Sequence, residues 1–240
     1  MITVLLGATA TPSAGDRVLL SDDEAHHLRV RRAIAEGREV RWTNGAGLQG
    51  AAMLVEAERA PAVLIGPVQR VPMPACLMLL VAAGDKERWS WLGEKAAELG
   101  VTHLVAVETE RSRHVASRLR DTHLPKLEAR LREACKQCGS AWAPALHPVV
   151  VELGAVPSII PVGAGRWLAD GAGAGSARSA DAFVSPIAVL IGPEGGLTEH
   201  EHAMLAAARF ARLRLGAHVL RFETAALAAA AVISARRAES

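Results

Sequence analysis

The residues best suited to chemistry lie in a glycine-rich run, Gly192-Pro193-Glu194-Gly195-Gly196, which follows an apolar stretch at 189–191. Glycines let the backbone approach a ligand closely, and in open α/β sheets ligands bind beyond the carboxyl ends of the strands. Thr198 and Glu201 form a capping box, which specifies the start of the next helix. The run therefore predicts a ligand-binding loop or, without a ligand, a tight strand–helix turn. It is not a P-loop, because no Gly-Lys-Ser/Thr follows.

A second cluster consists of Leu215-Gly216 and, shortly after it, Arg221, Glu223 and Thr224, again between a predicted strand and a predicted helix. An arginine at this place could grip an anion or the edge of a base. Glu223 is favourable near the positive end of a helix, and Thr224 is a natural N-cap residue. The spacing alone leaves a catalytic and a purely structural interpretation open.

Three weaker clusters are discounted. Cys135 and Cys138 have metal-ligand spacing but no second pair, and a closed zinc site needs four ligands, so packed or idle thiols and no metal site are predicted. His200 and His202 lack the spacing of a zinc-binding His-Glu-x-x-His helix and are predicted to lie in an exposed first helical turn. The pair at 26–27 is predicted to be a structural start of a helix.

The charge balance limits how the protein could bind nucleic acid. The chain has 27 Lys and Arg against 25 Asp and Glu in 240 residues, a net charge of +2, with half of the residues hydrophobic and no Tyr. These values exclude a long disordered chain and a broadly basic coat. They do not exclude nucleic-acid binding by local basic patches. Five arginines fall within residues 29–41, and eight Lys and Arg fall within residues 111–136. Each patch is interpreted as a phosphate-contacting face or as a solvated surface.

The compartment is predicted to be the cytoplasm, without membrane attachment. The longest apolar stretches, 76–83 and 225–233, fall short of the roughly 20 residues of a spanning helix. The first residues do not have the pattern of a signal peptide, and three cysteines suit a reducing compartment.

The elements that must position these residues fall into two predicted domains, residues 1–70 and residues 73–240. The first has short alternating runs at 18–20, 39–42 and 51–58, a helix at 22–32 capped by Ser21, and a turn at 44–47. Prolines at 61, 67, 72 and 74 predict a linker.

The second domain alternates strands and helices, which predicts an α/β fold with a mostly parallel sheet covered by helices on both faces. Strands are predicted at 76–83, 101–107, 149–151, 167–169, 189–191 and 211–215. Helices are predicted at 88–99, 125–138, 198–208 and 224–237, and a flexible loop at 171–181.

The two clusters together, Gly-Pro-Glu-Gly-Gly and then Leu-Gly and Leu-Arg-x-Glu-Thr-Ala, resemble the RsmE-type methyltransferases of the SPOUT superfamily. The similarity extends along nearly the whole chain. Further matching segments are 95–101 with 110–112, 134–139, and 26–30 with the turn at 45–47.

The resemblance implies a C-terminal SPOUT domain with a deep trefoil knot, an exception to the rule that chains are unknotted, and an N-terminal PUA-like β-barrel. It implies a homodimer that uses S-adenosyl-L-methionine to methylate N3 of a uridine in the decoding region of 16S ribosomal RNA, as naked rRNA or in the small ribosomal subunit. It places Arg221, Glu223 and Thr224 beside the methyl-transfer site. The cofactor-binding residues that it implies are Leu168, Ala169, Ile191, Gly192, Pro193, Glu194, Gly195, Gly196, Leu215, Gly216, Val219, Leu220 and Arg221.

The RNA-binding residues are expected in the two basic patches. They are Arg29, Arg31, Arg32, Arg111 and Arg113. The chain also departs from the family pattern: Phe222 stands where Thr is usual, Ser140 stands where Arg is usual, and residues 1–6 lack the usual Arg-plus-aromatic start.

Three alternatives stay open. A SPOUT methyltransferase acting on another RNA site shares every motif above. A non-catalytic RNA-binding adaptor with the same fold would not bind S-adenosyl-L-methionine. A nucleotide-dependent α/β enzyme would use the glycine-rich run for phosphate, although no Lys follows to complete such a site.

Overall fold

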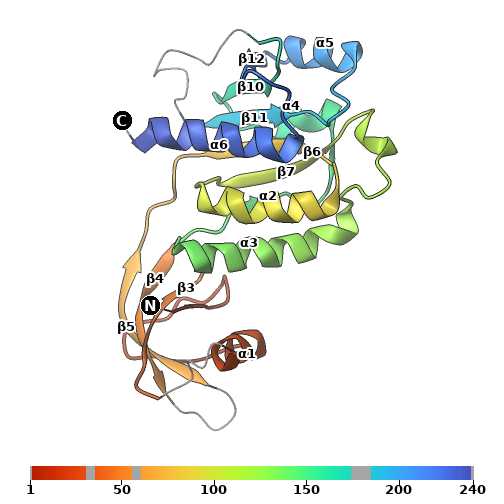
Figure 1. The fold of residues 1–240 in the computed structure, drawn as a ribbon. Helices are drawn as coiled ribbons and strands as arrows, with labels where there is room; N and C mark the ends of the chain where they lie inside the picture. Colours follow the sequence, from red (N-terminus) through yellow and green to blue (C-terminus); the bar gives the residue numbers. More distant parts are fainter. Residues whose placement is uncertain (1, 31–35, 56–60, 174–184, 239–240) are drawn as a thin grey trace. The chain divides into compact units, whose positions relative to one another are not determined.

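The structure is a computed structural model that describes residues 2–30, 36–55, 61–173 and 185–238 (Figure 1). The chain divides into two compact units. One consists of Met1–Met73 together with Arg132–Ala143, and the other of Pro74–Leu131 together with Pro144–Ser240. The division into functional domains at 1–70 and 73–240 stays a prediction.

The N-terminal unit is built on a curled, mixed half-barrel sheet with the strand order β1-β3-β4-β5-β2. Strands β1 and β3 pair in parallel, and the other neighbours are antiparallel. Val4, Leu28 and Trp42 are fully or almost fully buried in its core. The elements are β1 (Thr3–Leu5), β2 (Arg17–Leu19), α1 (Asp22–Val30), β3 (Glu39–Thr43), β4 (Leu48–Val55) and β5 (Ala62–Arg70).

Strand β5 corrects the predicted linker, since the chain around Pro67 is a nine-residue strand. The pairing of β4 with β5 is irregular between Gly50 and Ala52, opposite the segment that contains Pro67. A bulge interrupts the ladder of hydrogen bonds, so the missing N–H of a proline is tolerated there. The predicted turn at 44–47 is present: Asn44 Oδ1 accepts hydrogen bonds from the backbone N–H of Ala46 at 2.8 Å and of Leu48 at 3.0 Å.

The C-terminal unit contains a parallel sheet with the strand order β12-β10-β11-β6-β7-β8, in which β9 also pairs with β7. This confirms the predicted α/β class. The strands are β6 (Leu77–Ala82), β7 (His103–Glu108), β8 (Ala145–Leu146), β9 (Val151–Glu152), β10 (Gly165–Ala169), β11 (Ile187–Ile191) and β12 (Ala211–Leu213). The helices are α2 (Lys86–Glu98), α3 (Leu124–Cys138), α4 (Val156–Ile159), α5 (Glu199–Ala207) and α6 (Phe222–Ala238).

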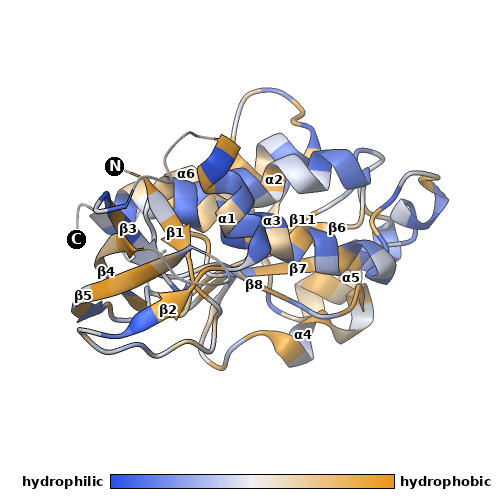
Figure 2. Ribbon diagram, turned by 90° about the horizontal axis from the view of Figure 1, so that it is seen from below, coloured by the Kyte–Doolittle hydropathy of each residue, from blue (hydrophilic) through white to orange (hydrophobic). Residues whose placement is uncertain are grey.

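Both faces of the central strands are buried. Every residue of β6 and β11 is buried, as continuous apolar runs in parallel sheets predict. Alternate residues of β6 enter two separate cores, so that Leu79 packs with residues of α2 and α6, whereas Leu80 packs with Val156 of α4 and Leu205 of α5. Figure 2 shows the apolar strands with α2 and α6 on one side and α4 on the other.

Two helix starts differ from the prediction. Helix α6 begins at Phe222, so Thr224 is not its N-cap residue, and the carbonyl of Arg221 accepts a hydrogen bond from the N–H of Ala225 at 2.9 Å. Helix α2 begins at Lys86, because Asp85 caps it by accepting from the N–H groups of Glu87 and Arg88. The predicted loop at 171–181 lies mostly outside the described residues. No described helix is long and apolar enough to span a membrane.

Candidate active site

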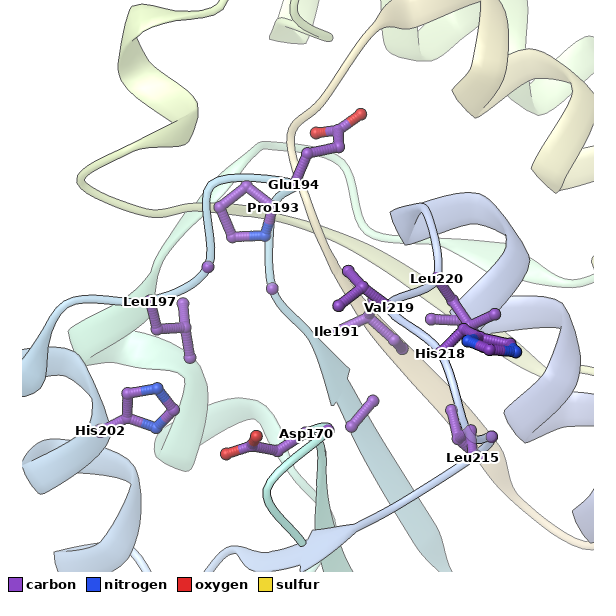
Figure 3. Close-up of a pocket in the computed structure, with 16 residues that line it drawn as sticks. Asp170, Ile191, Pro193, Glu194, Leu197, His202, Leu215, His218, Val219 and Leu220 are labelled. Carbon is purple, nitrogen blue, oxygen red and sulfur yellow. The ribbon is translucent and has the colours of Figure 1, made fainter.

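A pocket of about 200 Å³ opens at the carboxyl edge of the parallel sheet (Figure 3). It is formed by the segments that follow β10, β11 and β12 and by the first turns of α5 and α6. The carboxyl ends of parallel strands are where ligands bind in open α/β sheets. The pocket therefore lies where the glycine-rich run predicted a ligand site.

Most of the residues that the family resemblance implies for the cofactor line this pocket. They are Ala169, Ile191, Gly192, Pro193, Glu194, Gly196, Leu215, Gly216, Val219 and Leu220. Three others do not line it: Leu168 is buried in the sheet, Gly195 is exposed on the loop, and Arg221 is exposed at the start of α6. Asp170 and His218 also line the pocket; both fall within the loops 168–170 and 215–221 that the resemblance assigns to the cofactor. Sequence reasoning did not select the remaining lining residues, which are Gly171, Leu197, His202 and Ala225.

The glycine-rich loop is fixed by its own turn and by the helix that follows. Gly196 has φ of +74°, a value that favours glycine, and its N–H donates to the carbonyl of Pro193 at 2.8 Å. The predicted capping box is present, since Thr198 Oγ1 accepts from the N–H of Glu201 and Glu201 Oε2 accepts from the N–H of Thr198. The loop thus enters α5 in one defined geometry.

The loop after β7 is hydrogen-bonded to the same region. The buried Glu201 uses its second oxygen, Oε1, to accept from the N–H of Glu110 at 2.8 Å. The neighbouring Arg111 donates from Nη1 to the carbonyl of Gly195. Arg111, predicted to bind RNA, therefore lies against the glycine-rich loop.

An ion-pair cluster centred on Arg88 connects the pocket wall to α6. Arg88 Nη1 lies 3.3 Å from Glu194 Oε1 and 3.5 Å from Glu223 Oε1. Glu223 is 7% exposed, and its Oε2 has no hydrogen-bond partner within the described part of the chain. Sequence reasoning missed Arg88, because one arginine on an amphipathic helix has no distinguishing local pattern.

The three predicted catalytic residues have different environments. Arg221 and Thr224 are exposed, whereas Glu223 is buried beside Arg88. Phe222 is buried between them, and its ring occupies the space above Gly84, where an added Cβ would come within 2.6 Å of it. The departure from the family pattern at 222 is therefore accommodated by a glycine at the end of β6.

His202 corrects a prediction. Its side chain lines the pocket, and its Nδ1 is buried without a hydrogen-bond partner among the residues described. His200, two residues earlier, is exposed as predicted. The capping box fixes the start of α5, and the packing of this helix places His202 and not His200 at the pocket.

The predicted RNA-binding residues are placed as follows. Arg29 is exposed on α1, and Arg31 and Arg32 lie outside the described residues. Arg113 is half-exposed and pairs with Glu108 at 2.7 Å and Glu152 at 3.1 Å, and the hydrogen bond to Glu108 raises its pKa.

Lys136, the last residue of the basic segment 111–136, is not on the surface. Its side chain is 6% exposed and pairs with Glu24 at 2.6 Å and with Glu133 at 2.7 Å. The same segment contributes to a smaller hollow of about 100 Å³, lined by residues of α2 and α3 that include Lys86, Lys126 and Arg130. The positive charge that this segment can offer to a phosphate therefore does not include Lys136.

The two cysteines of α3 have different environments. Cys135 is buried and donates from Sγ to the carbonyl of Ser140 at 2.9 Å. Burial raises the pKa of the Cys135 thiol to about 11. Cys138 is exposed, and its Sγ donates to the carbonyl of Cys135 at 3.5 Å.

The parallel sheet and its edge pocket define an α/β protein with a loop-built ligand site, and residues 71–234 match the model of the RNA methyltransferase domain family. The chain belongs to that family. The structure resembles a Legionella pneumophila protein, described as a "putative methyltransferase" and solved in complex with S-adenosylmethionine, with 25% identity over 98% of this chain and 97% of that chain and a TM-score of 0.84.

Two further solved structures are similar along their whole length. One is ribosomal RNA small subunit methyltransferase E from Neisseria gonorrhoeae, bound to S-adenosyl methionine, with 25% identity over 98% of this chain and 97% of that chain and a TM-score of 0.80. The other is described as a "probable rRNA-methyltransferase" from Porphyromonas gingivalis, with 30% identity over 99% of both chains and a TM-score of 0.78.

Proposed function

We propose that this protein uses S-adenosyl-L-methionine to methylate N3 of a uridine in the decoding region of 16S ribosomal RNA. The observation that carries the proposal is the pocket at the carboxyl edge, formed by the three loops that the RsmE-type resemblance assigns to the cofactor. Membership in the RNA methyltransferase domain family and the similar structures with bound S-adenosylmethionine support it.

The pocket suits such a cofactor. Its wall combines apolar side chains such as Ile191 and Leu220 with glycine backbone and a few polar groups, which is the usual composition of a small-molecule site. Its volume of about 200 Å³ is below the roughly 300–1,000 Å³ of pockets that enclose a whole drug-sized ligand. A ligand held there would be partly open to solvent, as a donor must be when it passes a group to a second molecule. The buried, unpartnered Nδ1 of His202 supplies a polar group for it.

The chemistry assigns distinct tasks to the residues at the start of α6. S-adenosyl-L-methionine supplies an electrophilic methyl group on a sulfonium, so positioning dominates catalysis. Uridine N3 carries a proton on the pairing edge, and the base must be unpaired before it can react. Loss of that proton to solvent water leaves negative charge on N3, shared with the carbonyl oxygens, which a cation stabilises. The exposed Arg221 is assigned this task.

Glu223 is assigned a positioning task, with Thr224 beside it at the methyl-transfer site. Its ion pair with Arg88 supports this assignment, because the carboxylate is buried and already engaged with a cation that also contacts the pocket residue Glu194. A proton acceptor that must exchange with solvent would be more exposed.

We assign RNA binding to the exposed cationic side chains of both units, in a protein that acts as a homodimer. Arg29 is one of them, and the hollow lined by Lys86, Lys126 and Arg130 is a second place where phosphates could be held. Arg111 and Arg113 remain assigned to RNA, since both are exposed. The trefoil knot and the dimer stay predictions from the family resemblance.

The test is incubation with labelled S-adenosyl-L-methionine and small ribosomal subunits or naked rRNA, followed by nucleoside analysis. The expected product is N3-methyluridine. Arg221→Ala is expected to abolish methylation and to leave the circular dichroism spectrum and the oligomeric state unchanged. Wild-type turnover in Arg221→Ala would overturn its assignment.

Label in another nucleotide would point to another RNA site. Absence of cofactor binding by calorimetry would favour an RNA-binding adaptor.

A further inference from the structure

His202 is held at the pocket by backbone constraints that do not depend on its own side chain. It lies in the first turn of α5, where its N–H donates to the carbonyl of Thr198 at 2.9 Å. Thr198 is itself fixed by the reciprocal hydrogen bonds with Glu201. The backbone position of His202 is therefore held by the capping box.

One ring nitrogen of this side chain has no partner within the described residues. His202 Nδ1 is buried and makes no hydrogen bond there. Buried polar atoms in native proteins are almost always hydrogen-bonded, and each exception calls for an explanation. Since the same residue lines the pocket, a group that enters the pocket can provide the missing hydrogen bond.

Asp170, an acidic residue of the pocket wall, is already engaged. Asp170 Oδ1 accepts from the N–H of Ala172 at 2.8 Å, and Oδ2 lies 3.4 Å from Arg212 Nε. In Figure 3, His202 and Leu197 lie at one end of the pocket, whereas Leu215, His218 and Leu220 lie at the other. Arg221, which we assign to the reacting base, follows directly after Leu220.

We infer that His202 hydrogen-bonds the nucleoside part of the bound cofactor and so helps to determine which ligand the pocket accepts. The inference rests on the proposed function. The methyl group must lie at the α6 end, so the His202 end receives a part of the cofactor remote from it. An imidazole with a leucine beside it suits the edge and face of a heteroaromatic base better than it suits a charged amino-acid tail.

The test measures binding without turnover. Titration calorimetry with S-adenosylhomocysteine and with adenosine is carried out on the wild-type protein, on His202→Leu and on His202→Asn. Loss of one neutral hydrogen bond is worth about a 3- to 10-fold loss of affinity. His202→Leu is expected to show this loss for both ligands, and His202→Asn a smaller one. His200→Leu is the matched control, since that histidine is exposed on the same turn, and it is expected to bind as the wild type does.

A spectroscopic measurement separates hydrogen bonding from a purely structural role. In wild-type protein labelled with ¹⁵N at the imidazole nitrogens, the Nδ1 resonance that is missing from His202→Leu is expected to shift when S-adenosylhomocysteine is added. If His202→Leu fails to fold, the spectrum of His202→Asn identifies the same resonance by its absence.

Equal affinity of wild type and His202→Leu for S-adenosylhomocysteine, or an unmoved Nδ1 resonance, would overturn the inference while the proposed function stands. Weaker binding of S-adenosylhomocysteine with unchanged binding of adenosine would overturn the assignment to the nucleoside. A wild-type protein that binds neither S-adenosyl-L-methionine nor its product would overturn both this inference and the proposed function.

Discussion

The ion pair between Lys136 and Glu24 gives a quantitative test of the N-terminal unit. The two side chains are 6% and 4% exposed, and Nζ lies 2.6 Å from Oε1. Glu24 Oε2 is buried without a hydrogen-bond partner within the described residues, so Lys136 is the cation on which this carboxylate depends. Lys136 has a second partner, since Glu133 lies 2.7 Å away and is half-exposed.

Substitution of Lys136 and substitution of Glu24 are therefore expected to lower the free energy of unfolding by different amounts. Lys136→Met leaves the Glu24 charge buried and unpaired, which lowers the free energy of unfolding by about 3–5 kcal/mol. Glu24→Gln keeps an acceptor for Lys136, and Glu133 still balances its charge, so the loss is expected to be about 1–2 kcal/mol. The double variant Glu24→Leu/Lys136→Met removes both charges and is expected to lie within about 1 kcal/mol of the wild type.

Urea unfolding followed by tryptophan fluorescence measures these values, because Trp42 and Trp142 belong to the same unit. The double variant is also the functional control: its RNA affinity is expected to equal that of the wild type, since the buried Lys136 has no access to phosphate. The reasoning is refuted if both single variants lower the free energy of unfolding by the same amount, or if Lys136→Met lowers it by less than about 1 kcal/mol.

Two further predictions concern α2 and α3. Asp85 caps α2, and the hydrogen bond from the Ser117 side chain, followed by that from the N–H of Arg88, holds its pKa below the ordinary 3.8. Asp85→Ala is expected to lower the unfolding free energy by about 1 kcal/mol at pH 7. A carboxyl group with a lowered pKa stabilises the fold above pH 3.8, and this stabilisation is lost as the pH falls through the folded-state value. The difference in unfolding free energy between Asp85→Ala and the wild type should therefore shrink below pH 3.8. An equal difference in urea unfolding at pH 7 and pH 3 would contradict this. Cys138 is expected to react with a thiol reagent in the native protein at pH 8, whereas Cys135, with a pKa of about 11, reacts only after unfolding. Mass spectrometry of the labelled peptides checks this, and equally fast labelling of both cysteines would count against the packing of α3.

The parallel sheet and its edge pocket could be predicted because their causes are local in the sequence. Continuous apolar runs give β6 and β11, which are buried on both faces. Thr198 and Glu201 specify the start of α5 within four residues. Once the strands are parallel, the loops that follow them must meet at one edge, so the glycine-rich run and the Leu215-Gly216 pair come together without any long-range information.

The features that sequence reasoning missed depend on contacts between distant segments. Pro67 indicates a linker until the irregular pairing of its own strand β5 with β4 is known. Arg88 becomes important only through Glu194 and Glu223, which lie more than 100 residues further along the chain. His202 and His200 have the same local pattern, and only the packing of α5 decides that His202 lines the pocket.

Burial, and not the number of basic residues, decides which charges can reach RNA. Counting along the sequence treats all eight Lys and Arg of residues 111–136 alike. The structure separates them: Lys136 is buried in an ion pair, whereas Arg113 is half-exposed in pairs with Glu108 and Glu152. An exposed ion pair is worth only about 0–1 kcal/mol, so Arg113 can exchange a carboxylate for a phosphate at little cost. Lys136 cannot make this exchange, because it would leave the carboxylate of Glu24 buried and unpaired. A chain with a net charge of +2 can therefore still present a basic face, provided that its acidic partners are on the surface and easily displaced.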